Sequence, residues 1–242
     1  HLMEYFRVSA GAEAYQENDM LAAMNYLVRA AQGLKMPLVI CIGLGSNQGS
    51  HDGYMPLCKT LTALGNLSGV VPVAGCGNET GRAHHYYGSM QQNGEVHTAE
   101  IRVPENSTGF SLELWGQAPA VFSIGFKSPV GEIIPRIPAR LGQSENISFI
   151  LERTRIQVNY EIVQPVSGDQ LIFMRFFYPT PGIWNINVYS SNTTFNEEFH
   201  MWLPITGFTN PDVVFLAPNP YTTLTTPSVS PGAISVSTYD AV

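Results

Sequence analysis

The sequence carries little charge, because charged residues make up only 13% of its 242 residues, about half the fraction of an average soluble domain. The 12 Lys+Arg residues and 19 Asp+Glu residues leave a net charge of −7, and the basic residues do not cluster. Nucleic acids and anionic membrane surfaces bind basic patches, so we expect neither as a partner. No apolar run approaches the roughly 18 residues that a membrane-spanning helix needs.

Cysteine is equally scarce, with three residues, Cys41, Cys58 and Cys76. An odd number of cysteines in apolar surroundings does not suit a disulfide framework, so we expect buried thiols. The neighbouring His84 and His85 suggest a zinc site together with His51 and Cys76, but the spacing of zinc-binding motifs is missing. The sequence therefore predicts no metal site and no cofactor.

The first ninety residues predict alternating helices and strands. Apolar residues recur at helical spacing between Asn18, the expected N-cap, and Gly33, the expected stop. Residues 38–42 and 70–74 are apolar runs of strand length, and Pro56 opens a helix between them. Such continuous apolar strands suit a parallel sheet that helices cover on both faces. A strand, a helix and a strand of this size form a parallel crossover, which indicates an α/β segment.

After about Gly94 the pattern changes to short runs in which apolar and polar residues alternate. The clearest runs are residues 110–114, 156–162, 171–177 and 183–189. Short alternating strands separated by turn sequences are typical of a β-sandwich or jelly roll. The stretch from Gly207 onward is rich in loops, with one further strand expected at 233–237.

The end of the second expected strand carries the strongest chemical signal. It runs through Ala74-Gly75-Cys76-Gly77 directly into Asn78. Ligands bind at the carboxyl ends of parallel strands in α/β proteins, and small residues there let a substrate backbone approach. An Asn at such a place can donate its amide hydrogen to a developing oxyanion. Gly-Asn after a strand is also a common turn, so these residues alone leave both interpretations open.

The two strands and the residues that follow them resemble the subtilisin-like serine proteases (subtilases). The resemblance lies in residues 38–45 and 70–79. In that family one strand ends in Ser-Leu-Gly beside the substrate, and the next ends in Ala-Gly-Asn, whose Asn is an oxyanion donor. Gly43 stands where the family has Ser, so backbone hydrogen bonds stay possible while a hydroxyl contact is absent.

This resemblance implies roles for seven residues of the sequence. One wall of the substrate groove is expected from Gly43, Leu44 and Gly45. The border of the primary specificity pocket is expected from Ala74, Gly75 and Gly77. Asn78 is expected to be the oxyanion residue, and the partner is expected to be a protein or peptide substrate.

A narrower resemblance concerns the surrounding loops. Residues 49–53 and 81–88 resemble the corresponding segments in the subtilases of spore-forming anaerobes. That group includes the spore-germination proteases. Those proteins carry a jelly roll between the oxyanion Asn and the catalytic Ser, and residues 181–189 and 200–204 are similar to its closing strands. The resemblance implies a bacterial protein and leaves its location open between the spore and the cytoplasm.

The Asp, His and Ser motifs of the subtilase triad are absent from the sequence. We therefore expect an internal fragment, inactive alone, whose missing N- and C-terminal segments complete the fold. The expected fold class is α/β, a partial subtilisin-like parallel-sheet core with an inserted all-β jelly roll. The expected parts are core 1–93, insertion 94–206 and core 207–242. Two alternatives stay open, a catalytically dead regulatory relative and a carbohydrate-binding sandwich.

Overall fold

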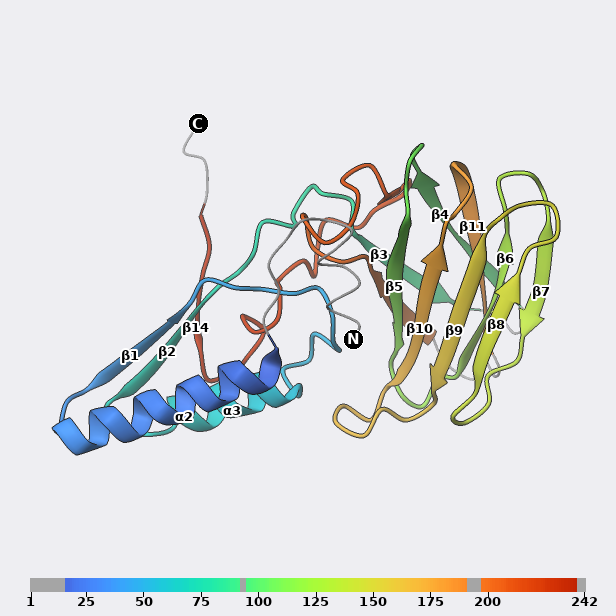
Figure 1. Cartoon of the computed structure of the whole chain (residues 1–242). Helices are drawn as coiled ribbons and strands as arrows, with labels where there is room; N and C mark the ends of the chain where they lie inside the picture. The colour runs from blue at the N-terminus through green and yellow to red at the C-terminus, as the bar shows by residue number, and fades with distance from the viewer. Residues whose placement is uncertain (1–15, 92–94, 191–196, 239–242) are drawn as a thin grey trace. The chain divides into compact units, whose positions relative to one another are not determined.

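The computed structural model describes residues 16–91, 95–190 and 197–238. The chain divides into two compact units (Figure 1). The first is built from two stretches, His1–Glu79 and Thr223–Val242, and the second from Thr80–Thr222. No helix within the described ranges is long and apolar enough to cross a membrane.

The first unit is a small α/β layer. Its helices are α2 (Glu17–Leu34) and α3 (Pro56–Gly65), and its strands are β1 (Leu38–Ile42), β2 (Val70–Gly75) and β14 (Ile234–Val236). The three strands form a parallel sheet in the order β1-β2-β14. The predicted strand–helix–strand crossover is confirmed, and the strand expected at 233–237 joins its sheet.

The ends of α2 differ from the sequence-based expectation. The helix begins at Glu17 with Gln16 as its N-cap, so Asn18 is wrong as the cap. The helix also passes Gly33 and ends at Leu34, with Lys35 as a C-cap in a left-handed conformation with φ of 57°. The amides of Lys35 and Met36 donate to the carbonyls of the preceding turn. These terminal hydrogen bonds offset the small cost of a glycine inside the helix.

Both helices cover one face of the sheet, as Figure 1 shows. Ile40 and Ile42 are buried on that face against α2 and α3. The opposite face is open, since Val39 is 66% exposed. The expectation of helices on both faces is therefore wrong for the described part of this chain.

The open face also decides the state of the cysteines. Successive strand residues point to opposite faces, so Cys41 shares the open face with Val39 and is exposed, contrary to expectation. Cys76 is half-buried. Only Cys58 is the expected buried thiol, and burial raises its pKa to about 11, with the charges of Asp52 and Glu17 adding to the rise. A thiol with such a pKa is chemically inert at neutral pH.

The second unit consists of two antiparallel sheets. One has the strand order β3-β12-β5-β10-β9-β8, and the other β13-β4-β11-β6-β7. Their bounds are β3 (His85–Met90), β4 (Val96–Val103), β5 (Gly109–Gly116), β6 (Phe122–Lys127), β7 (Ile133–Ile137), β8 (Ser144–Ser148), β9 (Arg155–Glu161), β10 (Gln170–Phe177), β11 (Gly182–Ser190), β12 (Glu197–Trp202) and β13 (Val214–Phe215). The four runs expected to be strands correspond to β5, β9, β10 and β11.

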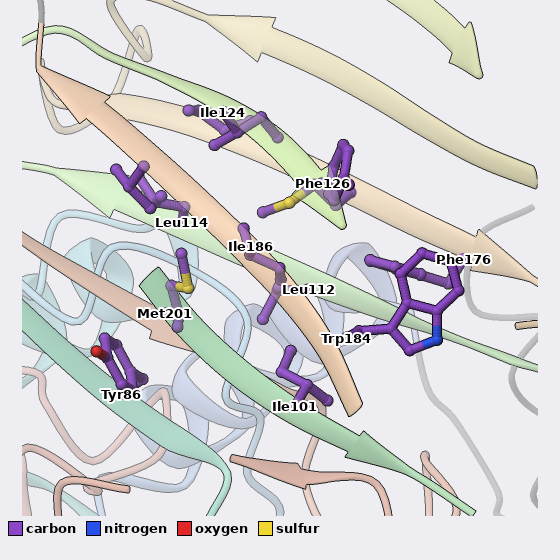
Figure 2. Packing of buried hydrophobic residues seen from close by; sticks show 14 of the residues in the cluster. Tyr86, Ile101, Leu112, Leu114, Ile124, Phe126, Phe176, Trp184, Ile186 and Met201 are labelled. Atoms are coloured by element: carbon purple, nitrogen blue, oxygen red, sulfur yellow. The ribbon is translucent and has the colours of Figure 1, made fainter. Parts of the chain in front are cut away.

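The core of this unit lies between its two sheets (Figure 2). Every second residue of β5 and β10 points inward, and Phe110 stacks on Phe176 with ring centroids 4.4 Å apart. Trp184 of β11 is fully buried, and its indole N–H donates to Thr180 O at 2.9 Å. Its ring meets the Phe176 ring edge-on. Apolar alternation on both sheets thus produces one shared core.

The second unit extends beyond the expected bounds 94–206 at both ends. The residues of β3 pair with β12, and the short β13 pairs with β4. The amide of Asn219 donates to His85 O at 2.9 Å, which attaches the segment after β13 as well. Gly94 itself lies outside the described residues. These pairings involve strands far apart in the sequence, so local patterns could not locate them.

We predict that Trp184→Ala destabilises the second unit by about 3–5 kcal/mol, because it leaves a large cavity between the sheets. Ile183→Ala is the matched control, since the adjacent Ile183 side chain is 46% exposed. The control is expected to change the free energy of unfolding by less than about 1 kcal/mol. Urea unfolding followed by circular dichroism measures both, and equal effects would contradict this account of the core.

Candidate functional site

The parallel pairing of β1 and β2 creates the candidate site. Ile42 lies opposite Ala74 in the register, so both strands end at the same edge of the sheet. Residues 43–45 follow β1, and residues 76–78 follow β2 at that edge. The structure thereby brings together the seven residues that the sequence analysis singled out.

The side chains at this edge differ in exposure. Leu44 is 47% exposed, and Asn78 is exposed, whereas Ala74 is fully buried. The next residue, Glu79, is 5% exposed and accepts a hydrogen bond of 3.5 Å from Asn47 Nδ2. The buried Glu79 thus ties the turn after β2 to the loop after β1, while Asn78 faces outward, where it can meet a ligand.

A third segment, which the sequence analysis missed, joins the two strand ends. The amide of Thr225 donates to Cys76 O at 3.1 Å. Thr226 forms an isolated antiparallel bridge with Ser46, with both N–H···O distances at 2.8 Å. Residues 225 and 226 therefore connect the loop after β1 with the loop after β2. No local signal marks them, because the sequence separates them from both strands by the whole second unit.

The Thr225 side chain lies between two glycines of the candidate site. A Cβ on Gly45 would come within 2.9 Å of Thr225 Cβ, and a Cβ on Gly77 would come within 2.8 Å of Thr225 Oγ1. Gly77 also has a φ of 85°, a conformation that favours glycine. Both glycines are therefore required by the close approach of Thr225.

His51 holds the same region together from the loop after β1. Its Nδ1 lies 2.8 Å from Leu224 O and its Nε2 lies 2.9 Å from Asn47 O. Burial lowers the pKa of His51, although the two carbonyl contacts and the charge of Asp52 act in the opposite direction. Asp52 accepts hydrogen bonds from Ser50 Oγ and the Tyr54 amide. The His51 and Asp52 side chains thus both form hydrogen bonds within the first unit, with His51 contacting two backbone carbonyls and Asp52 accepting from the loop itself.

The other histidines lie in the second unit. His85 Nε2 is 2.9 Å from His200 Nδ1, and Trp202 stacks on the His85 ring at 5.0 Å. The described residues include no group of three or more His, Cys, Asp or Glu side chains that could hold a metal ion.

Comparison with solved structures finds several similar chains. The chain is similar to the solved structure of the Clostridium perfringens CspB protease, with a TM-score of 0.83 and 26% sequence identity. The match covers 94% of this chain and 47% of the protease chain. No family model matches, and no curated protein matches. The neighbour is a subtilisin-like protease, so the match supports the family that the sequence resembles.

We predict that His51 makes the site region less stable at low pH. The lowered pKa means that the unfolded chain binds a proton at a higher pH than the folded chain. The contribution of neutral His51 to stability is therefore fully present above the ordinary His pKa of about 6.5. This contribution is lost as the pH falls below that value.

Hydrogen exchange at the Ser46 and Thr226 amides measures this effect locally, because these amides form the bridge between the loops. Between pH 7.5 and 5.5 their protection factors are expected to fall in the wild-type chain, and to fall less in His51→Gln. An identical pH dependence in both proteins would show that His51 does not control the bridge.

Proposed function

We propose that this chain forms the substrate-binding and oxyanion-stabilising part of a subtilisin-like serine endopeptidase. The observation that carries the proposal is the edge where β1 and β2 end together, with residues 43–45 on one strand and an exposed Asn78 on the other. The similarity to a protease over nearly the whole chain supports it. We also propose that the parent is of the spore-germination type, because residues 49–53 and 81–88 resemble that group of subtilases.

The catalytic triad would lie in parts of a longer protein. Two observations support this. The chain spans only 47% of the protease that it matches. One face of its parallel sheet also leaves apolar side chains uncovered, with Val39 66% and Ile234 56% exposed. Parallel sheets normally carry helices on both faces, so further segments of the parent would cover this one.

Residues 80–222 would be a jelly roll inserted into the protease fold. Strand order supports this part of the proposal. When the hairpin β8–β9 and the short β13 are left aside, the sheets read β3-β12-β5-β10 and β4-β11-β6-β7. Numbered one to eight along the chain, these strands lie in the orders 1-8-3-6 and 2-7-4-5, as expected for a double Greek-key sandwich.

The proposed mechanism divides the work between this chain and the rest of the parent. An extended peptide would lie along residues 43–45 and pair with their backbone, as a strand adds to an exposed edge. The parent's Ser would attack the scissile carbonyl, with His as base and Asp orienting the His. The Asn78 amide would donate a hydrogen bond to the carbonyl oxygen as it becomes an oxyanion.

We predict that Asn78→Ala in the full-length parent lowers kcat by about 10²–10³-fold with little change in KM. The amide contact gains strength mainly in the transition state, so its loss affects kcat. Steady-state cleavage of a fluorogenic peptide measures both constants.

Asn66→Ala is the matched control, because Asn66 is an exposed residue after α3, away from the strand ends. It is expected to leave both constants unchanged. An unaltered kcat in Asn78→Ala would reject the oxyanion role. Labelling of the wild-type parent by a fluorophosphonate separates the active protease from the catalytically dead relative, which would not react.

A further inference from the structure

We infer that Thr225 limits the size of the substrate side chain that precedes the scissile bond, so that the parent prefers small residues there. This inference rests on the proposed function and deepens it. It starts from the position of Thr225, between the ends of the two strands that would bind the substrate. All the residues that carry it belong to the first unit.

The backbone around Thr225 is fixed from both sides. Its amide donates to Cys76 O after β2, and the next residue bridges to Ser46 after β1. Its carbonyl accepts bonds from both the amide and the hydroxyl of Ser228, at 2.8 and 2.6 Å. The side chain therefore has little freedom to move away from the strand ends.

The side chain occupies the space that the glycines of the site leave open. Thr225 Oγ1 and Cγ2 lie where side chains of Gly45 and Gly77 would begin. Those two glycines belong to the expected groove wall and pocket border. Thr225 thus fills the region between wall and border with its own methyl and hydroxyl groups.

The Thr225 hydroxyl has no visible structural task. Thr225 is 1% exposed, and its Oγ1 hydrogen-bonds to none of the described residues. Buried polar atoms without partners are uncommon and call for an explanation. The proposed size limit offers such an explanation. The volume of the Thr225 side chain would exclude large substrate side chains, and this role needs no hydrogen bond from the hydroxyl.

A side chain that fills part of a binding pocket makes the enzyme select substrates with small side chains, because larger ones no longer fit. A single methylene group in a tight pocket changes the relative rate of two substrates by about 10–200-fold. Removing the three side-chain heavy atoms of Thr225 is therefore expected to admit larger side chains, whereas a change that keeps the volume should alter nothing.

The test compares Thr225→Gly with Thr225→Val in the full-length parent. The substrates are fluorogenic peptides that differ only in the residue before the scissile bond, either Ala or Phe. We expect the wild type to prefer Ala. Thr225→Gly is expected to raise the Phe/Ala ratio of kcat/KM by about 10-fold or more. Thr225→Val, which has the same shape, is expected to keep the wild-type ratio within about threefold.

Three outcomes would overturn the inference: a wild type that prefers Phe, a Gly variant with the wild-type ratio, or a Val variant that shifts the ratio as far as Gly does. Thermal unfolding shows whether Thr225→Gly folds, and Thr225→Ala, which keeps Cβ, gives an intermediate ratio if it does not.

If the parent cleaves neither peptide, the proposed function is refuted. The size limit set by Thr225 is then tested by a binding measurement. Fluorescence anisotropy of the same peptides, labelled and uncleaved, then reports the Phe/Ala ratio of dissociation constants. The same ordering of the wild type and the two variants supports the size limit, and equal ratios in all three reject it.

Discussion

The parallel pairing of β1 with β2 is the constraint on which the candidate site depends. Parallel strands in register end at one edge, so residues 43–45 and Asn78 lie at the same edge although α3, β2 and the connecting loops separate them in sequence. The helices on one face keep the two strands in place through a compact apolar cluster. The role proposed for Asn78 therefore depends on the order of this edge.

A second group of contacts keeps it ordered. Thr225 and Thr226 come from the far end of the chain and bond to both loops, while His51 reaches the Leu224 carbonyl from the loop after β1. The strand ends, the loop and the returning segment thus form one hydrogen-bonded arrangement. Glycine is needed at 45 and 77 because Thr225 lies so close, which gives these two small residues a steric reason that does not depend on the proposed substrate.

The two units bury their apolar residues to different extents. Between the sheets of the second unit, large side chains such as Trp184 and Phe176 are wholly inaccessible. In the first unit, the face of the sheet that carries Val39 and Cys41 is open. The low charge of the sequence fits both observations, because a sandwich core and an apolar sheet face each contain few charged residues.

The sequence by itself determined the local elements and the chemical character of the site. Apolar runs predicted β1 and β2, alternation predicted β5 and β10, and the segment from Ala74 to Asn78 suggested the candidate site, which stays a prediction. It misplaced the ends of α2, because hydrogen bonds at Lys35 outweigh the preference of glycine for a helix end. Only the tertiary structure decided the extent of the second unit, the exposure of Cys41 and the place of Thr225. Each of these depends on contacts between segments far apart in the chain, and periodicity, composition and short motifs carry no record of such contacts.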